Sequence, residues 1–233
     1  MCFNAEASFI GAAVIAPAGI AALAMVRDKR EIPFAALPLL FAGHQALEGW
    51  TWLELDGATN AELSGWGVHL WVLYAWALLP IYVPWSVWLV EPDERRRRWM
   101  VPLVAVGGLL AAFMAVQAVQ PEVQVTVVGQ NLDYHLGLPF SALWLGVPYV
   151  LATCLTPILS SFRWIMGFGV ANFVAMSAAA IIQSKDYSSM WCTFAAFLSL
   201  MIVGHFGYQT WLRRRGDVGP EVGPPGVSPA ATG

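Results

Sequence analysis

Residues 94–118 have the sequence ERRRRWMVPLVAVGGLLAAFMAVQA, in which four arginines precede a long apolar run. The run is close to the roughly 20 residues that an α-helix needs to cross a bilayer. Backbone N–H and C=O groups find no water inside a bilayer, so a spanning segment of this kind must be helical. The stretch therefore predicts a membrane-spanning helix with a basic end.

The rest of the chain repeats this alternation of apolar runs and short charged clusters. Of its 233 residues, 58% are hydrophobic and 12% are charged, too little charge to cover a soluble protein of this size. We therefore expect an all-α, polytopic bundle of seven transmembrane helices formed by residues 1–215, followed by a disordered cytoplasmic tail at 216–233. The predicted spans are about 8–26, 33–53, 66–90, 100–118, 139–159, 164–183 and 189–212.

The basic residues predict the direction of these spans. Eleven of the twelve follow odd-numbered spans, namely Arg27, Lys29, Arg30, Arg95 to Arg98, Arg163 and Arg213 to Arg215; Lys185 lies in an opposite loop. The positive-inside rule then places the C-terminus in the cytoplasm and the N-terminus outside, in a multi-pass plasma-membrane protein. A net charge of −3, with basic runs only beside spans, excludes nucleic-acid binding as a main role.

The longest external connection, from Gln120 to Leu138, contains an alternating stretch, VQVTVV, and then Gly-Gln-Asn. Alternation of this kind indicates a short extended segment followed by a turn. Such a loop could fold over the external mouth of the bundle as a lid, or it could be a plain connector.

Only one acidic residue lies well within a predicted span. It is Glu48, in the stretch GHQALEGWTW at residues 43–52. A spacing of four places His44 and Glu48 on one helical face, with Gln45 beside them. Ionisable groups are costly in hydrocarbon, so this face is expected to point into the bundle. We predict His44, Gln45 and Glu48 as catalytic residues.

Topology brings other metal-binding residue types toward the same external half of the membrane. With His44 and Glu48, the predicted ligands of a divalent metal such as zinc are Cys2, His69, His135 and Cys192. If Met1 is removed, Cys2 offers both a thiolate and an amine. Alternatively, Cys2 and Cys192 could form a disulfide. The sequence has no His-Glu-x-x-His and no Cys-x-x-Cys motif, so any metal site must be assembled across helices.

These residues leave several functions open. Our first hypothesis is a metal-dependent, hydrolase-type membrane enzyme that acts on a lipid or a small amphipathic substrate, with Glu48 as base or ligand. The alternative is a transporter, channel or sensor in which Glu48 and His44 bind an ion or relay protons. His44 and Glu48 could also only fix helix packing, in a non-catalytic membrane subunit.

Several segments together resemble a family. They are Met1 to Ala5, the stretch PFAALPLLF at 33–41, Gln45, Glu48-Gly49 and Trp191-Cys192. They are similar to an uncharacterised family of bacterial seven-helix membrane proteins whose members typically begin Met-Cys-Phe-Ser-Ala. Here Asn4 replaces the usual serine, which argues against a serine nucleophile at that position. The resemblance implies a seven-helix architecture and singles out Cys2, Gln45, Glu48 and Cys192, but it implies no activity.

Two wider analogies bear on which cofactor the chain could bind. Membrane-embedded zinc hydrolases of lipid amides look similar in helix count and orientation, but their ligand motifs are not found here. Microbial rhodopsins bind retinal through a lysine in the middle of the last helix. The lysines of this chain, Lys29 and Lys185, both fall in predicted loops, so a retinal Schiff base is excluded.

Overall fold

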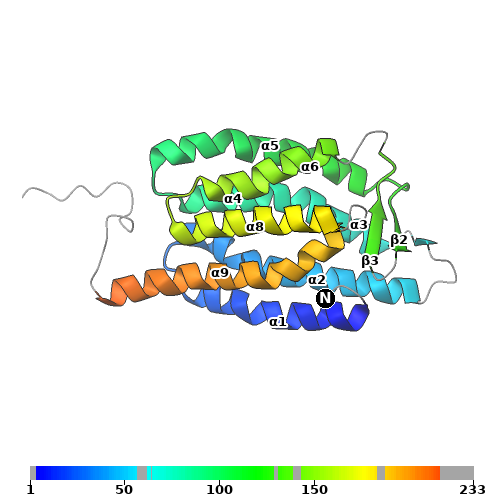
Figure 1. The fold of residues 1–233 in the computed structure, drawn as a ribbon, viewed down its shortest axis with the longest axis horizontal. Coiled ribbons are helices and arrows are strands. Elements are labelled where there is room, and N and C mark those ends of the chain that lie inside the picture. The colour runs from blue at the N-terminus through cyan, green and yellow to red at the C-terminus, as the bar shows by residue number, and fades with distance from the viewer. Residues whose placement is uncertain are drawn as a thin grey trace, which may run out of the picture.

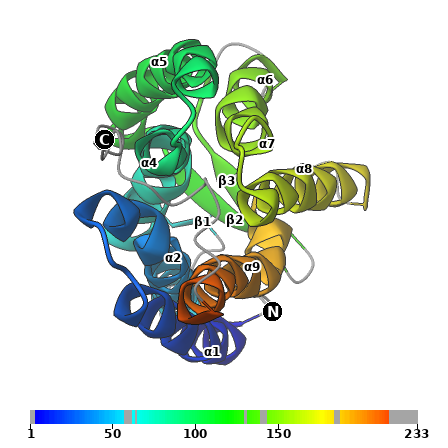
Figure 2. The same ribbon diagram turned by 90° about the vertical axis from the view of Figure 1, so that its left-hand side faces the viewer.

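The computed structural model describes residues 4–56, 62–63, 65–128, 131–138, 143–182 and 187–215. Within these residues the chain forms seven helical rods that run side by side in one bundle (Figures 1 and 2). The expected all-α seven-helix fold is thus confirmed. The rods are α1 (Ala5–Ala24), α2 (Ile32–Asp56), α3 with η2 and α4 (Trp66–Val72, Leu73–Leu78, Leu79–Val90), α5 (Glu94–Ala118), α6 with η3 and α7 (Leu143–Val150, Leu151–Leu155, Thr156–Ile158), α8 (Arg163–Ile182) and α9 (Tyr187–Arg215).

The outer surface of the bundle suits lipid better than water. In the described part of the chain, three rods are long and apolar enough to cross a membrane: α1, the α3–α4 rod and α5. Large apolar side chains are exposed along several helices, among them Val14, Leu109, Val174 and Leu200. Soluble monomers rarely expose apolar surface on this scale, so the fold and the composition together indicate a membrane protein.

The bundle has two chemically different ends. At one end, which we call the tail end, α9 finishes in three arginines and the short helix η1 (Lys29–Glu31) joins α1 to α2. The basic start of α5 lies at this end too (Figure 1). The opposite end carries a small sheet, and we call it the hairpin end. Among the described residues, the basic loops thus gather at the tail end, as the alternation along the sequence requires.

The sheet at the hairpin end is antiparallel and has the order β1 (Glu62–Leu63), β2 (Gln124–Val128), β3 (Asn131–His135). Strands β2 and β3 form a hairpin within the loop for which the sequence predicts an extended segment and a turn. Val125 and Leu132 of the hairpin are fully buried against Trp52 and Leu55 at the end of α2. The hairpin therefore covers this end of the bundle (Figure 1).

Two rods contain a π-helical segment, and each segment ends just before a proline. Segment η2 precedes Pro80 and segment η3 precedes Pro157. A proline inside a helix has no N–H to donate, and its ring clashes with the carbonyl of the fourth residue before it. Widening the preceding turn relieves both problems. The hydroxyl of Tyr149 donates to the carbonyl oxygen of Ala75 within η2, at 3.1 Å.

Helix α5 approaches this widened region closely. A Cβ atom added at Gly107 would overlap the carbonyl oxygen of Pro80 and would lie 3.3 Å from the Cβ of Ala152 in η3. Only glycine allows the backbone of α5 to pack against both irregular rods at this point. At Gly107 the backbone of α5 is therefore in direct contact with both irregular rods.

Candidate functional site

Glu48 lies on the buried face of α2. His44, Gln45, Glu48 and Thr51 expose 2%, 1%, 0% and 0% of their surface. They follow the helical spacing that the sequence predicts for one face, and that face points into the bundle. His44, Gln45 and Glu48 each take part in further interactions, so none of the three is without a partner. A buried carboxylate with an imidazole one turn away is the most unusual polar feature of an otherwise apolar helix.

An aromatic pair links Glu48 to the hairpin. The indole nitrogen Nε1 of Trp71, in α3, donates to Oε2 of Glu48 at 3.1 Å. The Trp71 ring stacks on Tyr134 of β3, with 3.7 Å between ring centroids and 7° between ring planes. Hairpin, indole and carboxylate thus form one connected series. If the hairpin moved away from the bundle, one face of the Trp71 ring would lose its contact with Tyr134. The hydrogen bond from Trp71 to Glu48 would then be disturbed.

Aromatic rings also enclose His44. Its ring centroid lies 4.8 Å from that of Trp71 and 5.7 Å from that of Tyr74. The hydroxyl of Tyr74 donates to the carbonyl oxygen of Leu40 at 2.9 Å, which fixes the position of that ring. The candidate site is therefore a small polar centre with aromatic walls, closed toward the hairpin end. In such surroundings the electrostatic interactions of Glu48 are much stronger than in water.

Two of the predicted metal ligands make contacts of their own at the hairpin end. His69 Nδ1 lies 2.7 Å from the carbonyl oxygen of Ala118. His135 Nε2 lies 3.1 Å from the hydroxyl of Thr126 and 3.4 Å from Oδ2 of Asp133, and the His135 side chain is 54% exposed. Within the described residues no three His, Cys, Asp or Glu side chains are grouped so that they could hold a metal ion. Of the predicted ligands whose side chains the structure describes, His44 and Glu48 share a buried face.

The predictions for the external cysteines fall on residues whose side chains the structure does not describe. Cys2 lies before the first described residue, Asn4. Cys192 belongs to α9, but its side chain is outside the described set. Proximity of Cys2 and Cys192, as ligands or as a disulfide, therefore stays a prediction. Cys154, the remaining cysteine, is buried in η3, where it accepts a hydrogen bond from Asn172 at 3.3 Å.

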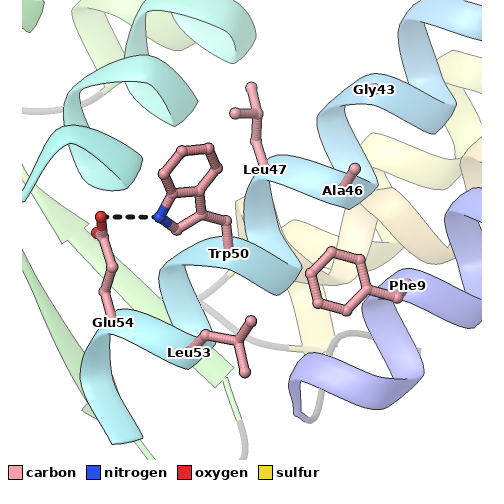
Figure 3. Close-up of a pocket in the computed structure, with 7 residues that line it drawn as sticks. All are labelled: Phe9, Gly43, Ala46, Leu47, Trp50, Leu53 and Glu54. Carbon is pink, nitrogen blue, oxygen red and sulfur yellow. Dashed lines mark hydrogen bonds between the residues drawn. The ribbon is translucent and has the colours of Figure 1, made fainter. Parts of the chain in front are cut away.

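A groove runs along α2 beside Phe9 of α1 (Figure 3). Its volume is about 480 Å³, and its lining residues are Phe9, Gly43, Ala46, Leu47, Trp50, Leu53 and Glu54. Trp50 Nε1 donates to Oε1 of Glu54 at 2.9 Å, and the backbone N–H of Gly67 donates to Oε2 of Glu54 at 3.2 Å. Glu54 thus ties the end of α2 to the start of α3. Because Glu48 does not line the groove, the groove and the buried site are separate features.

Sequence reasoning missed Trp71 and Tyr134 as parts of the site. Tryptophans near the ends of predicted spans are typical of an aromatic belt at the membrane surface, yet Trp71 is fully buried. A signal was present: Trp71 falls near the external start of the third predicted span, 66–90, in the same external half of the membrane as Glu48. No sequence spacing, however, could pair Trp71 with a tyrosine 63 positions later, because that contact depends on the register of the hairpin.

A second buried carboxylate was also missed. Glu91 follows α4 at the tail end and is 2% exposed. It accepts hydrogen bonds from the hydroxyl of Ser160 (2.9 Å), from the backbone N–H and hydroxyl of Ser161 (2.9 and 2.7 Å), and from the backbone N–H of Asp93 (3.2 Å). Glu91 therefore joins the loop after α4 to the loop after α7. At the edge of a predicted span it resembles an ordinary loop acid.

The comparisons with known proteins give a family and no activity. A family model described as "Family of unknown function (DUF6629)" matches residues 1–216, which contain every described residue. No match was found among curated proteins or among solved structures.

Proposed function

We propose that this chain, which belongs to the DUF6629 family of unknown function, is a multi-pass plasma-membrane protein with a cation site at Glu48. In this proposal the tail end faces the cytoplasm and the hairpin end faces outward. The observation that carries it is the complete burial of Glu48 beside His44, beneath an aromatic pair that the hairpin holds in place. A carboxylate in such an environment is costly unless a cation or a proton accompanies it.

The proposed cation is a divalent metal such as zinc. Glu48 and His44 supply an oxygen and a nitrogen donor from adjacent turns of α2, which are ligand types that zinc accepts. A complete site needs further ligands, and Cys2 and Cys192 are the candidates that the topology brings to the same end. Bound there, the metal would act as a Lewis acid toward a water molecule, in a hydrolase-type reaction on a lipid or small amphipathic substrate.

In this reaction the contribution of the chain itself is positioning and exclusion of water. Trp71 holds one carboxylate oxygen of Glu48 through its indole N–H. The stacked Tyr134 closes the site toward the aqueous side. The hairpin is the element whose displacement would open it.

The second candidate function is transport or sensing of an ion or a proton. It is favoured by the enclosure of Glu48 and His44 among Trp71, Tyr74 and Tyr134. Transporters bind their coupling ions near the middle of the bilayer, in polar centres that open to one side at a time. Here the hairpin would act as the outer gate.

Metal analysis of the purified protein tests the first candidate. We expect wild-type protein, purified without chelators, to contain close to one metal ion per chain, and Glu48→Gln to lose it. The matched control is Glu91→Gln, which removes the charge of the other buried carboxylate and should retain the metal. Wild-type protein without stoichiometric metal would end the enzyme proposal. Metal content unchanged in Glu48→Gln would place the ion elsewhere.

A further inference from the structure

The tail-end half of α9 carries a row of buried polar side chains that the Glu48 site does not use. His205, Gln209 and Arg213 are spaced by four residues, so they follow one another along one face of the helix. His205 is 4% exposed and Gln209 is 5% exposed. The row rises about 12 Å along the axis, at about 1.5 Å per residue.

Each member of this row has a buried polar atom without a hydrogen-bond partner among the described residues. The atoms are His205 Nδ1, Gln209 Oε1 and Arg213 Nε. Leaving one such atom unpaired in an apolar interior costs about 1–3 kcal/mol. Three such atoms on successive turns of one helix face would together cost several kcal/mol. We therefore expect these atoms to have hydrogen-bond partners in the protein.

The chemistry of the three atoms restricts what can bond with them. Gln209 Oε1 only accepts hydrogen bonds, and Arg213 Nε only donates. A fully ionised phosphate group could satisfy Arg213 but has no proton to donate to Gln209. A single kind of partner that serves both must donate and accept, which is the property of water. Buried water commonly makes about three such bonds to polar groups that the protein leaves unpaired.

The surroundings give the row a closed end and an open end. The His205 ring meets Phe34, Phe162 and Phe206 edge to face, with centroids 5.9, 5.0 and 5.0 Å away. At the other end, Arg213 Nη2 pairs with Oε1 of Glu31 at 3.4 Å, and their side chains are 27% and 21% exposed. The inner end of the row is therefore apolar, whereas its outer end reaches solvent.

We propose that this face of α9 holds a short file of ordered water that connects His205 with the aqueous phase beyond Arg213. The file begins at the Arg213–Glu31 pair, passes Gln209 and ends at the His205 imidazole. It gives a buried histidine a hydrogen-bonded route to the tail-end surface, at the opposite end of the bundle from Glu48. This inference goes beyond the proposed function and does not depend on a cation at Glu48.

Radiolytic hydroxyl-radical labelling of the wild-type protein in lipid nanodiscs tests the file, because brief X-ray exposure makes radicals from bound water where it lies. We expect oxidation of His205, and none at Phe41 and Phe168, which are equally buried in the apolar core. The variant Gln209→Leu should reduce His205 labelling several-fold, while Tyr208→Phe, an outward-facing change on the same turn, should leave it unchanged.

The proposal is overturned if His205 in the wild-type protein stays as unlabelled as Phe41 and Phe168, whatever the variants do. It is also overturned if Gln209→Leu folds and His205 is labelled as in the wild type. Metal content at Glu48 does not enter either result, so failure of the file and failure of the cation site are distinguishable.

Discussion

Among the described residues two carboxylates are buried, Glu48 and Glu91, and they lie toward opposite ends of the bundle in different surroundings. Glu91 accepts four hydrogen bonds from two loops, and three of the donors come from Ser160 and Ser161. Glu48 lies within a helix among aromatic rings, and one of its partners is the indole of Trp71. Glu91 has the environment of a structural link, whereas Glu48 has that of a reactive or ion-binding group.

The difference shows why burial alone does not identify a functional acid. Both side chains are almost completely covered, with 0% and 2% of their surface exposed. What separates them is the source of their hydrogen bonds. Backbone and serine donors from a loop stabilise one fixed geometry, because the loop folds around the carboxylate. An indole that is itself stacked on a surface hairpin couples the carboxylate to an element that can move.

The largest loss of stability is expected for Glu91→Ala. Removing the acceptor leaves the donors of Ser160 and Ser161 buried without a partner, which should lower the free energy of unfolding by about 3 kcal/mol. Thermal unfolding in detergent measures the loss. The control is Glu94→Ala, whose exposed ion pair with Arg98 spans 3.7 Å and should contribute under about 0.5 kcal/mol. Equal losses in the two variants would remove the structural role of Glu91.

A smaller and more local effect is expected for Tyr134→Ala. Losing the ring that stacks on Trp71 should weaken the attachment of the hairpin by about 2 kcal/mol. Hydrogen exchange of the β2 and β3 amides should accelerate, while the amides of α5 should be unaffected. Val127→Ala, a change at an exposed side chain of β2, is the matched control. If both variants exchange alike, the hairpin is not held by the stack and its part in the site is lost.

The smallest change in stability is expected for Glu48→Gln. Glutamine keeps the shape of the side chain, and its amide oxygen can still accept from Trp71, so unfolding should shift by only about 1 kcal/mol. The bound cation should nevertheless be lost, because the variant has no negative charge at this position. Thermal unfolding and circular dichroism check the first part. A loss as large as that of Glu91→Ala would mean that Glu48 is mainly structural, and the comparison between the two acids would collapse.

The helical bundle could be predicted from sequence because a bilayer leaves few alternatives. An apolar run such as residues 100–118 must satisfy its backbone internally, so its helix follows from length and composition. The shared face of His44 and Glu48 follows from a spacing of four within one helix. The prediction of an extended segment and a turn after Gln120 rested likewise on local alternation, and the structure has β2 and β3 there.

The remaining parts of the site depend on contacts between distant segments. Trp71 reaches Glu48 because α3 packs against α2, and Tyr134 reaches Trp71 because the hairpin folds back over both. Glu91 meets Ser160 and Ser161 only when two loops at the tail end come together. Sequence spacing carries no information on such pairings. Sequence spacing could therefore predict His44 and Glu48 but not Trp71 and Tyr134, which cover them.

The most direct test of the central claim is the thermal shift that divalent cations produce in three proteins from which a chelator has first removed any bound metal: wild type, Glu48→Gln and Glu91→Gln. A ligand that binds only the folded state raises stability by about 2.7 kcal/mol at a hundred times its dissociation constant. We predict that zinc, or another ion of a panel with manganese and calcium, raises the unfolding temperature of the wild type. Glu91→Gln should unfold earlier yet keep the shift, and Glu48→Gln should lose it. A wild type that no ion of the panel stabilises, or a Glu48→Gln variant that keeps the full shift, would contradict a cation site at Glu48.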